Sequence, residues 1–236
     1  MNKDDQGRVI VFDLDDTLYP EITFVRSGLR AVASVLESSG QATKEEALQV
    51  LEETLERDGR GRVFDTAIKE LRLRNVSVRS LISVYRGHSP QISLDRESIQ
   101  TLRLANELSR GDVYLVTDGN RLVQRRKVAA LELESHFRKI YYTRDYGLAA
   151  EKPSCAVFER IQKLSSKPIS NFTFVGDDPT KDFECVLSHG GQAIRIRRGR
   201  LSGHHSFDRL QAQHQVTEIS EVQDKLRGIF NSETAS

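Results

Sequence analysis

In Val9-Ile10-Val11-Phe12-Asp13-Leu14-Asp15-Asp16-Thr17, four apolar residues run directly into three carboxylates and a threonine. The apolar part is short, β-branched and aromatic, which is typical of a strand buried on both faces in a parallel sheet covered by helices. Acids that follow such a strand lie at its carboxyl end, where open α/β sheets place their ligands. The stretch therefore predicts an α/β fold with a functional site directly after its first strand.

The spacing of these acids favours a cation site. In an extended chain Asp13 and Asp15 lie on the same side. Carboxylates this close repel one another unless a cation or a cationic side chain lies among them. With one more acid from elsewhere in the chain, they would form an oxygen-ligand site for Mg²⁺. A strand followed by an acidic turn or a helix cap is the plainer alternative for this stretch.

Length and composition indicate a globular protein. The chain has 236 residues, enough for one large domain or for a core with a smaller insert, and 38% of them are apolar. The net charge of +1 gives no global field that would favour nucleic acid or an anionic membrane as a partner. No apolar run approaches the length needed to cross a bilayer, and Met1 to Arg8 contain no apolar signal-peptide core.

The two cysteines, Cys155 and Cys185, have no metal-ligand spacing and do not resemble a disulfide framework. A reducing, cytoplasmic setting fits this cysteine usage best. Nothing in the sequence indicates the oligomeric state.

The order of the expected elements gives the domain organisation. Residues 20–90 show helical spacing without a strand, and Thr43 with Glu46 forms a capping-box pattern. After Pro90, expected strands at 112–117, 140–142, 172–175 and 192–196 alternate with helices, including one that opens at Glu151-Lys152-Pro153 and a last one over 218–229. This alternation predicts a doubly wound parallel sheet. We therefore expect a core of residues 1–19 plus 91–236 and an inserted all-helical cap of residues 20–90.

Polar residues follow several of the expected strands. Thr117 ends the second strand, and Asp177 and Asp182 follow the fourth. The carboxyl ends of parallel strands meet at one edge of the sheet, so these groups should meet Asp13 there. Carboxylates with Mg²⁺, a threonine and Lys152 suit phosphoryl transfer, because cations neutralise phosphate charge and hydroxyl and N–H groups hold its oxygens.

These residues resemble the four motifs of the haloacid dehalogenase superfamily, in order. The motifs are Asp13-Leu14-Asp15-Asp16-Thr17, then Thr117, then Lys152-Pro153, then Gly176-Asp177 with Asp182. The resemblance spans the chain from Val9 to about Ile196, and the helical insert resembles the cap that some members carry after their first strand. It implies a Rossmann-like core.

The resemblance implies a role for each matching residue. Asp13 would be the nucleophile and a Mg²⁺ ligand, and Asp15 the general acid/base that also gives its backbone carbonyl to the metal. Thr117 and Lys152 would bind the transferring phosphoryl group. Dehalogenases of the superfamily typically lack an acid two residues after the nucleophile, so Asp15 favours a phosphatase.

Two more acids complete the implied site. Asp177 would be the third protein ligand of the metal, and Asp182 would bind it through water or orient Lys152. We thus expect a Mg²⁺-dependent phosphatase of a small phosphomonoester, such as a sugar phosphate or a nucleoside monophosphate, with a cap that closes over the substrate. A phosphomutase on the same fold and a non-catalytic binding or regulatory protein are the alternatives.

Several residues carry a second interpretation. Thr117 would otherwise cap the helix that follows it, and Lys152 would be a surface lysine. The sequence leaves open whether Asp178 takes part in the site, and it favours supporting roles for Asp16 and Asp118.

Residues outside the motifs are less informative. The hinge residue His88 would either touch substrate or pack, and the basic run 195–200 is expected to be a solvated strand end rather than a nucleic-acid site. His204 and His205 have no third metal ligand nearby in the sequence.

Overall fold

A computed structural model describes residues 7–203 and 211–232. The chain divides into two compact units, Met1–Glu21 with Ser93–Ser236 and Ile22–Ile92. The expected domain boundaries, after Tyr19 and after Pro90, lie two residues before these junctions. His204, His205 and the last residues of the C-terminal tail fall outside the described ranges.

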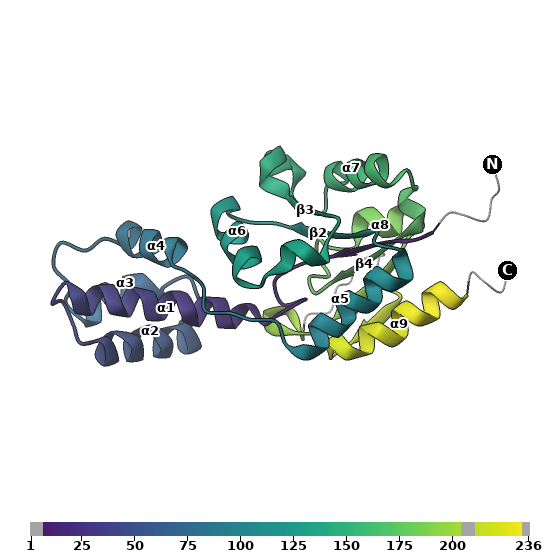
Figure 1. The fold of residues 1–236 in the computed structure, drawn as a ribbon. Helices are drawn as coiled ribbons and strands as arrows, with labels where there is room; N and C mark the ends of the chain where they lie inside the picture. Colours follow the sequence, from purple (N-terminus) through teal and green to yellow (C-terminus); the bar gives the residue numbers. More distant parts are fainter. Residues whose placement is uncertain (1–6, 204–210, 233–236) are drawn as a thin grey trace. The chain divides into compact units, whose positions relative to one another are not determined.

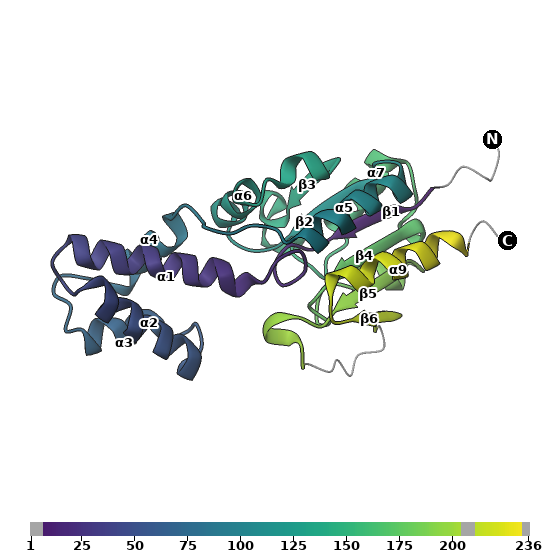
Figure 2. The same cartoon turned by 60° about the horizontal axis from the view of Figure 1, so that its bottom comes forward.

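The larger unit is built on a parallel sheet of six strands in the order β3-β2-β1-β4-β5-β6 (Figures 1 and 2). The strands are β1 Val9–Phe12, β2 Val113–Thr117, β3 Lys139–Tyr142, β4 Phe172–Gly176, β5 Gln192–Ile196 and β6 His214–Val216. All four residues of β1 are buried, as expected for a central strand. The predicted doubly wound α/β core is confirmed, with β6 as a short edge strand that the sequence did not reveal.

Helices cover both faces of this sheet. Helix α5 (Arg96–Ser109) packs against α9 (Ile219–Asn231) on one face, while α7 (Ala156–Ser165) and α8 (Glu184–Ser188) lie on the other (Figures 1 and 2). Helix α6 (Arg121–Ala130) links β2 to β3. Short 3₁₀ segments span Leu133–His136, Thr143–Tyr146, Leu148–Ala150, Ile169–Asn171 and Gly199–Leu201.

The smaller unit is all-helical. It consists of α1 (Glu21–Ser38, whose first residue belongs to the larger unit), α2 (Lys44–Asp58), α3 (Val63–Glu70) and α4 (Val78–Gly87). The capping box of Thr43 and Glu46 is present at the start of α2. His88 packs inside this unit, with its ring 5.0 Å from that of Phe24 and its Nδ1 2.6 Å from the carbonyl oxygen of Tyr85. None of the described helices is long and apolar enough to span a membrane.

Two expectations near α7 were wrong. The helix begins at Ala156, not at Glu151, so Lys152 and Pro153 lie in the loop before it, joined by a cis peptide bond. Cys155 and Cys185 form a disulfide with their Cα atoms 5.4 Å apart. They are 30 residues apart in the sequence, but α7 and α8 bring both into one hydrophobic cluster, which spacing does not reveal. The disulfide removes the cysteine argument for a cytoplasmic setting.

Candidate active site

Asp13 lies where β1 ends, at the centre of the sheet. Its backbone N–H donates to the carbonyl oxygen of Val175 at 2.9 Å, so β4 fixes the start of the loop. This is where the strand order reverses between β1 and β4, the position at which doubly wound sheets bind ligands. The side chain of Asp13 is 9% exposed and accepts a hydrogen bond of 2.5 Å from the ammonium of Lys152.

Lys152 connects two of the expected motifs. Its buried Nζ lies 2.5 Å from Asp13 Oδ1 and 2.7 Å from Asp182 Oδ1. Burial disfavours its charge, but the charges of Asp13, Asp182 and Asp118 outweigh burial and raise the pKa of Lys152 well above its usual value. The backbone N–H of Lys152 donates to Asp118 Oδ1 at 3.2 Å, which holds the loop in place. Lys152 is therefore a fixed cation against the carboxylate of Asp13.

Asp182 organises the turn after β4. Its Oδ2 accepts from the backbone N–H groups of Asp177 and Asp178, at 3.1 and 3.0 Å, while its Oδ1 faces Lys152. A Cβ on Gly176 would collide with this carboxylate, so the close approach requires a residue without a side chain. In this arrangement the carboxylate of Asp182 both orients Lys152 and shapes the turn that carries Asp177.

The acids here fit a divalent cation. Asp13, Asp177 and Asp182 each offer a carboxylate oxygen, and these oxygens lie within 4.8 Å of one another. Burial, opposed by Lys152 and reinforced by Asp182, raises the pKa of Asp13 to about 7. Burial and the charges of Asp13 and Asp182 raise the pKa of Asp177 to about 9. A bound cation would relieve this crowding, and hard oxygen ligands of this kind suit Mg²⁺.

We expect Mg²⁺ to raise the melting temperature of the protein, and Asp177→Asn to remove most of that rise. At about one hundred times its dissociation constant, a ligand that binds only the folded state adds about 2.7 kcal/mol, which shifts Tm by about 5–10 °C for a chain of this size. The control is Asp178→Asn, because Asp178 Oδ1 accepts from Thr180 and an Asn oxygen keeps that contact. Differential scanning fluorimetry with Mg²⁺ and with EDTA tests this. Equal shifts in the wild type and Asp177→Asn would contradict the ligand role.

Asp15 is held by a network of side chains that its sequence motif does not indicate. Its Oδ1 accepts from the Tyr19 hydroxyl at 2.7 Å, and its Oδ2 accepts from Gln124 Nε2 at 2.8 Å. The ammonium of Lys127 lies 2.7 and 2.9 Å from the two oxygens. Burial alone would raise the pKa of Asp15, but the charge of Lys127 and these hydrogen bonds outweigh burial and lower it. Asp15 is therefore a partnered, ionised carboxylate.

Thr117 lies at the end of β2 with its side chain buried. Its Oγ1 accepts from Gln124 Nε2 at 2.6 Å, so one amide contacts both Thr117 and Asp15. The cap of α6 is not Thr117 but Asn120, whose Oδ1 accepts from the N–H groups of Leu122 and Val123. The capping alternative for Thr117 is thereby removed.

The other acids of the motifs have structural contacts. Asp16, at φ 55°, accepts from the N–H of Glu21 at 2.9 Å and so helps to start α1. Asp118 accepts from Thr143 Oγ1 at 2.8 Å as well as from Lys152 N. Lys181, which belongs to none of the four motif positions, lies with its Nζ 3.5 Å from Asp118 Oδ2.

The basic run 195–200 begins inside β5, and its first residue is not solvated as expected. Arg195 is 4% exposed, and it donates to the carbonyl oxygens of Asp177 at 3.2 Å and Leu201 at 2.8 Å. It therefore supports the Asp177 turn from the neighbouring strand. Its position as the fourth residue of a buried strand, with apolar neighbours, was the available signal.

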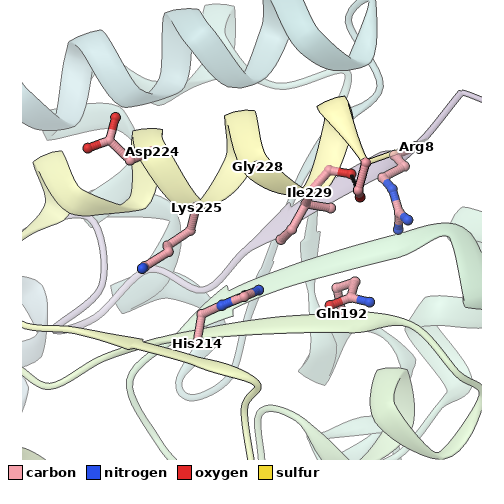
Figure 3. A pocket seen from close by; sticks show the side chains of 8 residues that line it. Arg8, Gln192, His214, Asp224, Lys225, Gly228 and Ile229 are labelled. Carbon is pink, nitrogen blue, oxygen red and sulfur yellow. Dashed lines mark hydrogen bonds between the residues drawn. The ribbon is translucent and has the colours of Figure 1, made fainter. Parts of the chain in front are cut away.

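A surface pocket of about 390 Å³ lies away from these residues (Figure 3). Gln192 and His214 begin their strands, Arg8 precedes β1, and Lys225 approaches from α9. These positions mark the amino ends of the strands, opposite the edge that carries Asp13. The pocket therefore does not belong to the candidate active site.

Comparisons with known proteins agree on one family. The model of the haloacid dehalogenase-like hydrolases matches residues 8–185. A glyceraldehyde 3-phosphate phosphatase from Methanocaldococcus jannaschii is 27% identical over 196 residues, covering 81% of this chain and 85% of that protein.

Solved structures share the fold. The structure of YfnB from Bacillus subtilis, a protein assigned to the HAD-hydrolases and solved bound to magnesium, superposes with a TM-score of 0.67 at 17% identity, covering 94% of this chain and 99% of that one. A 2-haloacid dehalogenase from Pseudomonas syringae superposes with a TM-score of 0.62 at 19% identity, covering 95% of this chain and 99% of that one. Since a phosphatase relative and a dehalogenase neighbour both occur, the reaction must be argued from the site.

Proposed function

We propose that this chain, which belongs to the haloacid dehalogenase-like hydrolase family, is a Mg²⁺-dependent phosphatase that hydrolyses a small phosphomonoester through an aspartyl-phosphate on Asp13. The observation that carries the proposal is the pairing of two carboxylates in different environments. Asp13 lies against Lys152 at 2.5 Å, whereas Asp15, two residues on, lies in a separate network. Two carboxylates with different surroundings suit a nucleophile and an acid/base.

The first step forms the covalent intermediate. A carboxylate oxygen of Asp13 attacks phosphorus, a new O–P bond forms, and the bond from phosphorus to the substrate oxygen breaks. Asp15, when it carries the proton, gives it to that leaving oxygen. Lys152 and the hydroxyl of Thr117 stabilise the charge on the transferring phosphoryl group.

The second step returns the enzyme to its starting state. Asp15, now a carboxylate, takes a proton from a water molecule, and the resulting oxygen attacks phosphorus. The O–P bond to Asp13 breaks, and inorganic phosphate leaves with Asp13 again ionised. The network around Asp15 supports the carboxylate form that this step needs.

The side chains of Asp13 and Asp177 and the backbone carbonyl of Asp15 would hold Mg²⁺, and Asp182 would remain with Lys152. When bound, the metal supplies positive charge beside the phosphoryl group. The proposed substrate class is supported by a relative: the protein named glyceraldehyde 3-phosphate phosphatase favours a small sugar phosphate over a nucleoside monophosphate.

The test is phosphate release from a panel of triose and hexose phosphates, glycerol 3-phosphate and nucleoside monophosphates, with Mg²⁺ and with EDTA. We expect release only with Mg²⁺, and fastest from a sugar phosphate of few carbons. Release that is unchanged in EDTA would contradict the metal requirement. A protein that binds Mg²⁺ but releases no phosphate from any compound would contradict the phosphatase.

A further inference from the structure

The network around Asp15 has a part that the proposed reaction does not use. Gln124 and Lys127 lie three residues apart on α6, so they share one face of the helix. Both side chains are buried, although the helix is otherwise rich in exposed arginines. A buried lysine on a surface helix is uncommon unless it is paired. Lys127 is paired with Asp15, and it also lies 3.3 Å from Glu21.

The donors around Asp15 fill its acceptor positions. A carboxylate has about four lone-pair sites, two on each oxygen. Here Tyr19 and Lys127 donate to Oδ1, while Gln124 and Lys127 donate to Oδ2, all at 2.7–2.9 Å. The contacts therefore fix one rotation of the carboxylate. Because Lys127 reaches both oxygens, it can keep one contact while the other oxygen meets a leaving group.

Gln124 ties this carboxylate to the phosphate-binding threonine. Its amide nitrogen lies 2.6 Å from Thr117 Oγ1 and 2.8 Å from Asp15 Oδ2. Thr117 is the last residue of β2, whereas Asp15 lies in the loop after β1, so the two belong to different segments of the chain. One side chain thus contacts both groups, and small misplacements of catalytic groups are costly.

We propose that Lys127 and Gln124 are positioning residues that hold Asp15 in the orientation needed to protonate the leaving oxygen. The inference rests on the proposed phosphatase function. It assigns neither residue a contact with substrate. Their effect passes through Asp15, so it depends on how much a substrate needs protonation of its leaving group.

Substrates whose leaving groups differ in basicity can show whether a substitution disturbs the positioning of Asp15 or the fold as a whole. An alkyl phosphate needs a proton on its leaving oxygen, whereas 4-nitrophenyl phosphate loses a stable phenolate without one. In single-turnover phosphoenzyme formation, we expect Lys127→Met to slow the reaction of glycerol 3-phosphate by about 10- to 100-fold. That is less than the roughly 10²- to 10⁴-fold that acid catalysis typically contributes, because Asp15 itself remains. The rate with 4-nitrophenyl phosphate should change by less than about threefold. Gln124→Met, which has similar volume but no donor, should give the same pattern more weakly.

Arg126→Met is the matched control, because Arg126 is an exposed neighbour on the same helix. It should leave both rates unchanged. If Lys127→Met slows the reactions of both substrates equally, its role is structural only and the inference is overturned. An unchanged or faster rate with glycerol 3-phosphate would also overturn it. If Lys127→Met fails to fold, the same comparison of the two substrates with Gln124→Met tests the inference.

A measurement of stability, which does not depend on catalysis, tests this inference separately from the proposed function. In a double-mutant cycle of urea unfolding with Asp15→Asn and Lys127→Met, the effects should be non-additive, with the double variant more stable than the sum predicts. Additive effects would overturn the contact whatever the activity. A wild type that releases no phosphate from any alkyl phosphate of the panel or from 4-nitrophenyl phosphate would instead refute the proposed function.

Discussion

Replacing Asp13 with Asn leaves a folded protein that releases no detectable phosphate. The amide is a poor nucleophile, so no acyl-phosphate can form, and the fall in kcat should be about 10⁴-fold or more. Uncatalysed phosphomonoester hydrolysis is so slow that the site must supply on the order of 20 kcal/mol of barrier reduction, and the rest of the site cannot replace the nucleophile.

Folding should survive this change because the environment of Asp13 already disfavours its charge. Burial and neighbouring acids raise the pKa of Asp13, so an uncharged side chain of the same shape costs little there. Lys152 keeps Asp182 as a partner at 2.7 Å. Asp145→Asn is the control, since Asp145 pairs with Arg121 and Arg125 away from the site. Steady-state phosphate release and circular dichroism check both points, and turnover near the wild-type rate by Asp13→Asn would refute the nucleophile.

Lys152→Met is expected to lose both activity and stability. Lys152 is the cation between Asp13 and Asp182, and its side chain is 1% exposed. Removing one partner of a buried ion pair typically costs about 3–5 kcal/mol, because the remaining charges are left unpaired. Losing a preorganised cation or donor at the transferring group should lower kcat by about 10²- to 10³-fold. Urea unfolding and phosphate release measure the two effects.

The second variant in this test removes one of the unpaired charges. Asp13→Asn in the Lys152→Met background should restore part of the stability, although not the activity. Lys163→Met, an exposed position on α7, serves as the control and should change neither quantity. If the changes in the free energy of unfolding caused by the two substitutions simply add, Lys152 does not compensate the charge of Asp13.

The fold followed from local pattern because the strongest signals are local. The apolar strand Val9–Phe12, the helical spacing of residues 20–90 and the alternation of later strands with helices are all patterns among neighbours in the sequence. The edge strand β6 has three residues, only one of them buried, and so presents almost no pattern. The disulfide depends on how α7 and α8 pack, which no spacing between Cys155 and Cys185 encodes.

The site was predictable to the extent that strand ends mark it. Asp13 and Asp177 follow β1 and β4, Thr117 ends β2, and parallel strands bring such ends together. Lys152 comes from a loop, and its identification depended on the resemblance to a known family. The structure brings its ammonium to Asp13.

The supporting residues could not be identified in this way. Gln124, Lys127 and Arg195 are polar residues on elements whose pattern predicts only packing. Their signal is a polar residue at a position that should be buried: Lys127 precedes buried Val128, and Arg195 stands between Ile194 and Ile196. Buried polar groups require partners, so such positions indicate a nearby site, but not which atoms they contact.

The measurement that tests the account most directly is the mapping of a trapped phosphoenzyme. The protein is mixed with Mg²⁺ and the best substrate of the panel, quenched in acid during turnover, digested and analysed by mass spectrometry. We expect one phosphoryl group on the peptide that contains Asp13, removable by hydroxylamine and absent from Asp13→Asn. Two results would contradict the account. One is phosphate release by a wild type whose phosphoryl group lies on another residue; the other is phosphate release by Asp13→Asn.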